Sequence, residues 1–149
     1  MKRQPHNQTG WKLPSDAALT CVGCRARKLS RVVSAIYDEA LGQLKLKISQ
    51  FGILAILSRS GPSTAGDLCR VIMMDKSTGS RNLQRLRQRG WISIRADRGR
   101  GQVLSLTRAG ARVLRSAYPL WREAQEEATR RLRADGLKAL DTVLARIGD

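Results

Sequence analysis

The segment from Asp75 to Thr107 constrains the fold of this 149-residue chain more than any other segment. Asp75 or Ser77 is typical of a helix N-terminus, and Gly90 is typical of the first residue beyond a helix C-terminus. Two short apolar runs follow at 91–94 and 103–107, and a turn rich in Gly and Arg joins them. The sequence therefore predicts a basic helix followed directly by a two-stranded β-hairpin.

The predicted helix separates apolar and polar residues onto opposite faces. At 100° per residue, Leu86 and Gly79 lie within about 60° of Leu83, and the residues opposite them are basic or carry hydroxyl or amide groups. Such side chains hydrogen-bond to the base edges and phosphates of DNA, and a basic β-turn reaches along the phosphate backbone. The alternative is a basic, solvated helix beside a basic hairpin. We expect double-stranded DNA as the partner, contacted by Ser77, Thr78, Ser80, Arg81, Gln84, Arg85, Arg98 and Arg100.

Apolar residues at helical spacing predict further helices on both sides of this segment. The expected helices lie at about 15–42, 49–60, 64–72, 113–128 and 137–147. In this order, the elements predict a mainly α fold with a small β-hairpin wing, which is a winged helix-turn-helix. Residues 1–14 carry Pro and Gly without periodicity, and we expect them to form a flexible arm.

The length of the chain fits one domain, which we place at residues 15–149. Within it, residues 47–107 are the expected DNA-binding lobe, and residues 15–46 and 108–149 are helices that flank it. A central unit of about 60 residues cannot cover three long apolar helix faces. We therefore expect the flanking helices to be dimerisation helices, which pack against each other and against a second copy in a homodimer.

The charge of the chain agrees with a polyanionic partner. Lys and Arg outnumber Asp and Glu by 28 to 12, and the net charge is +16. Residues 51–110 alone carry eleven basic and three acidic residues. A nonspecific architectural DNA-binding protein is the alternative, although its charge would be spread more evenly along the chain. Near-equal affinity for operator and random DNA would favour that alternative.

Other classes of protein are excluded by the sequence. No apolar run reaches the roughly 18 residues of a membrane helix, and the N-terminus has no apolar signal region, so we expect a cytoplasmic protein. A single histidine, His6, and three cysteines supply neither a metal cluster nor a nucleophile–base pair. We therefore expect no cofactor, no metal ion and no enzymatic activity.

Two stretches of the chain carry a family resemblance, DLCRVIMMDKSTGSRNLQRLRQRGWISI and ADRGRGQVLSLTRAG. Their most specific features are hydroxyls before Arg81, a wing with Asp97, Arg98 and Arg100, and an LT-x-x-G ending at Leu106, Thr107 and Gly110. Over about residues 20–145 the chain resembles the MarR family of bacterial transcription regulators. The resemblance implies an obligate homodimer joined by its first and last helices, a pseudo-palindromic operator, and repression relieved by a ligand or an oxidant. Gly79 departs from the family, whose members usually carry a larger apolar residue there.

Cys21 and Cys24 lie three residues apart on one face, at the start of the first predicted helix. A helix N-terminus lowers the pKa of a thiol, so the pair is a candidate redox or thiophilic-metal sensor. The alternative is that both are small residues beside a packed interface. Cys69, in the short third helix, is expected to be buried by packing.

A small-molecule inducer needs a pocket, and four aromatic residues are candidates to line one between the dimerisation helices and the DNA-binding lobe. Core packing accounts for each of these residues equally well. The candidates are Tyr37, Phe51, Tyr118 and Trp121.

Overall fold

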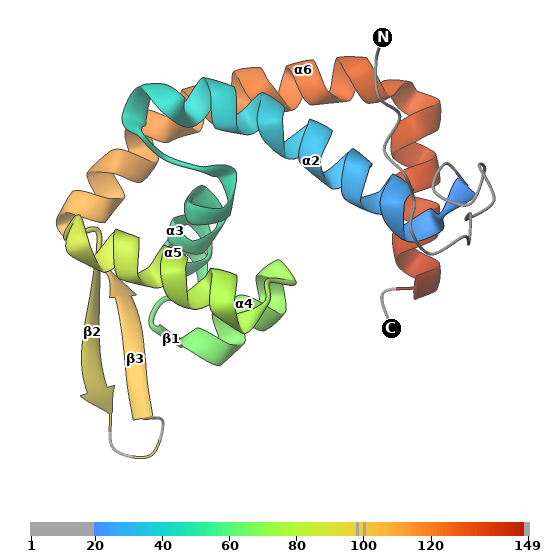
Figure 1. The fold of residues 1–149 in the computed structure, drawn as a ribbon. Coiled ribbons are helices and arrows are strands. Elements are labelled where there is room, and N and C mark those ends of the chain that lie inside the picture. The colour runs from blue at the N-terminus through green and yellow to red at the C-terminus, as the bar shows by residue number, and fades with distance from the viewer. Residues whose placement is uncertain (1–19, 98, 100, 148–149) are drawn as a thin grey trace, which may run out of the picture. The chain divides into compact units, whose positions relative to one another are not determined.

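The computed structural model describes residues 20–97, 99 and 101–147. The chain divides into two compact units, residues 1–33 and 34–149. Helix α2 (Val22–Leu41) begins in the first unit and ends in the second, and every later element belongs to the second unit. These later elements are η1 (Gly42–Leu44), α3 (Ile48–Ser60), β1 (Ser63–Thr64), α4 (Ala65–Ile72), α5 (Lys76–Gln88), β2 (Ile92–Asp97), β3 (Gly101–Leu106) and α6 (Arg108–Ile147) (Figure 1).

The described residues contain five α-helices and a three-stranded antiparallel sheet, so the predicted class, mainly α with a β wing, is confirmed. The strand order is β1-β3-β2. Strand β1 was not expected, because its two residues carry no alternating pattern and are strand only through pairing with β3. Strand β2 continues past the expected end at residue 94, because its pairing with β3 runs to Asp97 opposite Gly101. Gly99 and Gly101 have φ angles of 103° and 73°, which favour glycine.

Helices α4 and α5 form the helix-turn-helix, and the expected side chains cap both. The Thr64 hydroxyl accepts a hydrogen bond from the Asp67 amide at 3.2 Å, and the Asp75 carboxylate accepts one from the Thr78 amide at 2.8 Å. Each cap satisfies an amide that the first helical turn leaves without a backbone partner. Met73, with a φ of 56°, ends α4 in the left-handed conformation and leads the chain into α5.

Helix α3 lies at the centre of the core of the second unit, because it contacts α4, α5, α6 and β3. Burying a large apolar side chain contributes about 1.5–3 kcal/mol, so a few leucines account for much of the packing energy. The largest fully buried side chains are Leu41, Leu46, Ile53, Leu54, Leu68, Leu86 and Leu104.

The start of α6 passes very close to the backbone that follows α5. A Cβ at Gly110 would lie 2.1 Å from the carbonyl oxygen of Trp91, so only glycine fits there. The Thr107 hydroxyl donates to the carbonyl oxygen of Gly90 at 2.7 Å and accepts from the Gly110 amide at 3.0 Å. The LT-x-x-G ending therefore has a physical reason: its threonine caps α6 and its glycine permits the close approach.

The two helices expected over 113–128 and 137–147 both lie within α6, which has a kink at Arg133. The backbone angles of Arg133, φ 58° and ψ 170°, are not helical. The expected helix start near residue 15 and the arm over 1–14 lie outside the described residues. Large apolar side chains remain exposed in each unit. They are Val22, Leu29 and Val32 in the first and Val71, Met73, Tyr118, Val143, Leu144 and Ile147 in the second.

No single helix among the described residues is long and apolar enough to cross a membrane. One bent pair, Val22–Leu44 with Ile48–Ser60, passes by length and composition alone, which buried core helices also do.

Candidate nucleic-acid interface

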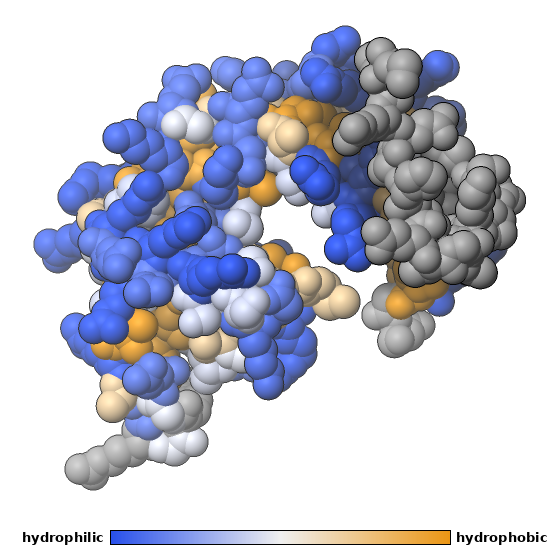
Figure 2. All heavy atoms as spheres, viewed as in Figure 1, coloured by the Kyte–Doolittle hydropathy of each residue, from blue (hydrophilic) through white to orange (hydrophobic). Residues whose placement is uncertain are grey.

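The structure contains the two predicted faces of α5. The buried residues of this helix are Gly79, Asn82, Leu83 and Leu86. Of the predicted DNA contacts on α5, Thr78 is half-buried and the exposed ones are Ser77, Ser80, Arg81, Gln84 and Arg85. Hydrophilic side chains gather over α5 on the face that Figure 2 shows. The helical pattern did not predict that Asn82 is buried, because a polar amide is not expected among the apolar residues of a helix face.

A chain of hydrogen bonds holds Arg81 along the first turns of α5. Its Nη2 donates to Thr78 Oγ1 at 3.3 Å and to Ser77 Oγ at 3.5 Å. The Ser77 hydroxyl in turn donates to the Asp75 carboxylate at 2.7 Å. The structure therefore brings three of the predicted contacts together at the N-terminal end of α5. A guanidinium that is already oriented loses less conformational entropy when it binds.

Hydrogen bonding keeps the carboxylate at the start of α5 ionised. The Ser77 hydroxyl, followed by the Thr78 amide, holds the pKa of the Asp75 carboxyl far below its ordinary value. The Thr64 hydroxyl, with a further contribution from Arg70, lowers the pKa of Asp67 at the start of α4 in the same way. The Asp75 carboxylate caps α5, and the Asp67 carboxylate is paired with Thr64 Oγ1 and Arg70. The exposed polar side chains of α5 available to a polyanion are therefore its hydroxyls, its amides, its arginines and Lys76.

Arg89, the C-cap of α5, is part of the fold. Its Nη1 donates to the carbonyl oxygen of Lys45 at 2.5 Å, and its guanidinium carbon lies 4.7 Å from the ring centroid of Trp91. Arg95 is exposed on β2. Arg98 and Arg100, the two predicted contacts in the wing, lie outside the described residues.

Cys69 of α4 fills the space that a side chain at residue 79 would occupy. A Cβ on Gly79 would lie 2.3 Å from Cys69 Sγ, and the next atom, Met74 Sδ, is 3.9 Å away. The sequence predicts that Cys69 is buried by packing. In the structure it packs against α5 but is only half-buried. The departure from the family at Gly79 therefore has a structural partner, because the missing side chain allows the thiol between α4 and α5.

An open groove of about 1090 Å³ lies between α4, α5 and the sheet. Ser80 and Gln84, two of the predicted DNA contacts, line it. Its other lining residues include the exposed basic side chains Arg70, Lys76 and Arg87 and the buried Leu83 and Leu104. Sequence reasoning missed this groove because it exists only where the folded sheet meets the two helices.

Of the four aromatic residues predicted to line a pocket, three stack on one another in the second unit, and the fourth, Tyr37, contacts Gln125 of α6. Phe51 and Tyr118 each stack on Trp121, with ring centroids 5.8 Å and 5.9 Å apart respectively. The Tyr37 hydroxyl donates to Gln125 Oε1 at 2.5 Å, and partial burial raises the pKa of Tyr37. The large groove described above is lined by other residues. The contacts among these aromatics are those of packed side chains, and their role toward a ligand stays a prediction.

Cys21 and Cys24 are both exposed, and Cys21 directly precedes α2. Hydrogen bonds from the Cys24 backbone and thiol, and from the Gly23 backbone, lower the pKa of the Cys21 thiol. The contact between the two thiols raises the pKa of Cys24. Among the described residues, no group of three or more His, Cys, Asp or Glu side chains is arranged to hold a metal ion.

Comparisons with known proteins identify the family. The model of the MarR family matches residues 44–102. The HTH-type transcriptional repressor NicR of Pseudomonas putida is 29% identical over 107 residues, which are 70% of this chain and 68% of NicR. The multiple antibiotic resistance protein MarR of Escherichia coli is 26% identical over 115 residues, which are 75% of this chain and 80% of MarR. Residues 44–102 of the chain belong to the MarR family.

Solved structures share the fold of this chain. A mutant of Escherichia coli MarR in complex with operator DNA is 22% identical, covers 91% of this chain and 99% of its own, and has a TM-score of 0.76. The BpsR protein of Bordetella bronchiseptica is 19% identical, with coverages of 93% and 99% and a TM-score of 0.77. The fold is a MarR-like winged helix-turn-helix. The chain is a DNA-binding transcription regulator, in a family whose members are not enzymes.

Proposed function

We propose that this regulator is a homodimeric, cytoplasmic repressor that binds a pseudo-palindromic operator and is released by a small-molecule ligand or by thiol oxidation. The exposed face of α5 carries the proposal, because Arg81 is held there by Ser77 and Thr78 with its guanidinium oriented. A fixed guanidinium suits bidentate contact with guanine. The relative NicR, a transcriptional repressor, and the complex of a MarR mutant with operator DNA support this direction.

The predicted contacts divide into two roles in this proposal. Ser77, Thr78, Ser80, Arg81 and Gln84 lie on the first two to three turns of α5 and contact base edges in the major groove. Arg85, with Arg98 and Arg100 of the wing, contacts phosphates. Base contacts carry sequence discrimination, and phosphate contacts carry affinity that falls with salt.

Exposed apolar side chains support a homodimer. In the first unit Val22 is 79% exposed, and in the second unit Ile147 is 74% exposed. Leaving such side chains in water is costly, and a second copy of the chain would cover them. Two copies then place two α5 helices on successive major grooves, about one helical turn of DNA apart. Sedimentation of the protein at micromolar concentration tests the dimer, and a single monomeric species would contradict it.

Two arginine variants test the division of roles. Arg81→Ala should weaken operator binding by about 1–3 kcal/mol and relax the preference at one base position. Arg98→Ala should weaken binding to all sequences alike and reduce the salt dependence. Fluorescence anisotropy at several salt concentrations, with a selected duplex and a scrambled one, measures both effects. The reverse pattern would refute the roles, and equal affinity of the wild type for both duplexes would favour the nonspecific architectural protein.

Two routes of release are part of the proposal. The DNA binding of BpsR, a protein of the same fold, is regulated by 6-hydroxynicotinic acid, and this supports a small-molecule ligand here. For this chain, Tyr37, Phe51, Tyr118 and Trp121 are the proposed aromatic surroundings of such a ligand. Titration of the tryptophan fluorescence with candidate aromatic acids tests this, and a Trp121→Phe variant with unchanged affinity for an identified ligand would contradict it.

The thiol route rests on the exposed pair Cys21 and Cys24 and on the lowered pKa of the Cys21 thiol. The Cys21 thiolate attacks a hydroperoxide, the O–O bond breaks, and the alkoxide leaves and takes up a proton. The resulting sulfenic acid condenses with the Cys24 thiol to a disulfide, and water is released. Operator affinity of Cys21→Ser and Cys24→Ser proteins, with and without peroxide, tests this route. A response to peroxide identical to that of the wild type would refute it.

A further inference from the structure

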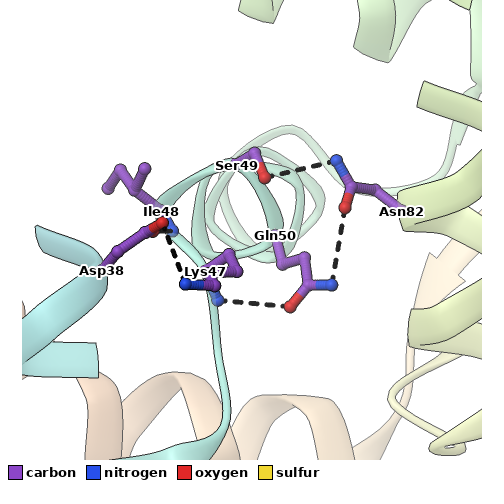
Figure 3. A network of polar contacts seen from close by, with 6 residues as sticks. All are labelled: Asp38, Lys47, Ile48, Ser49, Gln50 and Asn82. Atoms are coloured by element: carbon purple, nitrogen blue, oxygen red, sulfur yellow. Dashed lines mark hydrogen bonds and ion pairs between the residues drawn. The ribbon is translucent and has the colours of Figure 1, made fainter. Parts of the chain in front are cut away.

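Two buried amides, one on α3 and one on α5, hydrogen-bond to each other beneath the exposed face of α5 (Figure 3). Gln50 and Asn82 are only 4% and 6% exposed, and Gln50 Nε2 donates to Asn82 Oδ1 at 3.4 Å. Asn82 Nδ2 donates to Ser49 Oγ at 3.2 Å and to Met74 Sδ at 3.6 Å. Within the part of the chain that the structure describes, no buried side-chain nitrogen or oxygen lacks a partner. The bonds from Gln50 Nε2 to Asn82 Oδ1 and from Asn82 Nδ2 to Ser49 Oγ therefore depend on how α5 lies against α3.

The same network continues to the end of α2. Gln50 Oε1 accepts a hydrogen bond from the Lys47 amide at 3.2 Å. The Asp38 carboxylate accepts one from the Ile48 amide at 2.8 Å, and Lys47 Nζ lies 3.2 Å from it. Figure 3 shows these contacts in one view, from Asp38 on α2 to Asn82 on α5. Directional bonds within the second unit thus tie α5 to the N-terminal turn of α3, and that turn to α2.

Directional bonds constrain a helix differently from apolar contacts. Leu83 and Leu86 hold α5 against the core, but apolar contact is non-directional and changes little when a helix rotates slightly. A hydrogen bond weakens steeply as its angle departs from linear. A buried amide that loses its partner destabilises the fold, because it has given up its hydrogen bonds to water and gained none in return. A rotation of α5 about its axis would therefore be opposed by the hydrogen bonds of Asn82 on its buried face, in addition to the bond that Arg89 makes at its C-terminal end.

We propose that Gln50 and Asn82 are positioning residues that set the rotation of α5 and thereby its discrimination between DNA sequences. Asn82 follows Arg81 directly, so the two side chains turn together with the helix. Contacts with base edges depend on alignment, whereas contacts with phosphates carry no sequence information and tolerate small shifts. Loss of the amide pair should consequently reduce specificity more than total affinity. This inference rests on the sequence-specific binding proposed above.

The double variant Gln50→Met/Asn82→Leu tests the inference, because it removes both amides together and nearly keeps their volumes. Replacing both partners by apolar groups of similar shape is close to neutral for the pair itself, whereas either single variant leaves one buried amide group unpaired. The remaining cost of the double variant comes from the part-buried Lys47 amide and Ser49 hydroxyl, which lose Gln50 and Asn82 as partners. The probes are a duplex of about 30 base pairs, which the wild type selects from a random pool, and a scrambled duplex of the same composition. We expect the ratio of the two affinities to fall about tenfold, with an unchanged salt dependence because the phosphate contacts remain.

A matched control separates specificity from stability. Ile92→Val removes one methylene from a side chain that is 2% exposed on β2 and has no part in the amide network. It should lower the Tm and leave the affinity ratio unchanged. A folded double variant with the affinity ratio of the wild type would overturn the inference. A wild type that does not distinguish the two duplexes would refute the proposed function, and the inference with it.

A milder variant decides the question if the double variant does not fold. Ser49→Ala removes one hydrogen-bond partner of Asn82 from a half-buried position, and alanine is a good helix former. Its affinity ratio should fall about threefold, again without a change in salt dependence. An unchanged ratio in Ser49→Ala, with the double variant unfolded, would equally overturn the inference.

Discussion

Gly79→Ala tests the close approach of α4 and α5 when it is made both in the wild type and in Cys69→Ala. In the wild type the added Cβ would lie 2.3 Å from Cys69 Sγ, which forces a shift. Overpacking of this kind costs about 1–3 kcal/mol, and replacing a helical Gly by Ala stabilises by about 1 kcal/mol. We therefore expect Gly79→Ala to lower the free energy of unfolding by about 1 kcal/mol in the wild type.

In the Cys69→Ala background the sulfur is absent, and the nearest remaining atoms lie 3.9 Å and 4.0 Å from the added Cβ. These are ordinary contacts, so only the helix propensity changes and Gly79→Ala should stabilise by about 1 kcal/mol. The effect changes sign between the two backgrounds, which corresponds to a coupling free energy of about 2 kcal/mol.

Urea unfolding at one fixed protein concentration, under reducing conditions, measures this double-mutant cycle. Gly136→Ala in α6 is the control, because its added Cβ would lie 3.7 Å from Leu132 Cβ, an ordinary distance. It should stabilise by about 1 kcal/mol in both backgrounds. Equal effects of Gly79→Ala in the two backgrounds would refute the contact between residue 79 and Cys69.

Three further substitutions test other parts of the fold. Gly110→Ala should lower the free energy of unfolding by more than about 2 kcal/mol, because its Cβ would lie 2.1 Å from a backbone carbonyl oxygen. Urea unfolding measures this, and a loss below about 0.5 kcal/mol would contradict the prediction. Asp75→Ala should lower the stability at pH 7. Because the pKa of the Asp75 carboxyl is lowered in the folded state, the difference in stability between variant and wild type should shrink as the pH falls below 3.8. Thermal melts from pH 7 to about pH 2 measure this difference, and a constant difference speaks against the prediction. Arg133→Gly should stabilise by about 1 kcal/mol by relieving a φ of 58° with a ψ of 170°, and a lower Tm would exclude strain at that residue.

Features that depend on neighbours in the sequence were predictable from the sequence. The caps at Thr64 and Asp75, the glycine after α5 and the two faces of that helix all follow from residues within a few positions of one another. The exposed face of α5, which supplies most of the predicted contacts, is where the helical pattern placed it. The order of the elements was also sufficient to predict the winged helix-turn-helix, because few folds combine these elements in that order.

Features that depend on distant partners were not predictable. Strand β1 exists only because Ser63 and Thr64 pair with β3 about 40 residues away. The bond between Gln50 and Asn82 joins residues 32 positions apart, and neither amide belongs to a periodic pattern. The groove beside α5 likewise needs the sheet in place before it exists. In each case the local sequence is compatible with several outcomes, and a tertiary contact selects one of them.

The buried face of α5 contains two departures from an apolar pattern, Gly79 and Asn82, and each has a specific partner. Gly79 accommodates Cys69 Sγ from α4, and Asn82 pairs with Gln50 and Ser49 of α3. The leucines of this face stabilise α5 without fixing its rotation, so on this face the orientation of α5 depends on these two contacts. A chimera that carries residues 76–88 of this chain in another MarR-family scaffold should therefore acquire its sequence preference only when residues 49, 50 and 69 are transferred as well. Binding-site selection with and without these three residues measures this, and identical selected sequences would show that the leucines alone orient the helix.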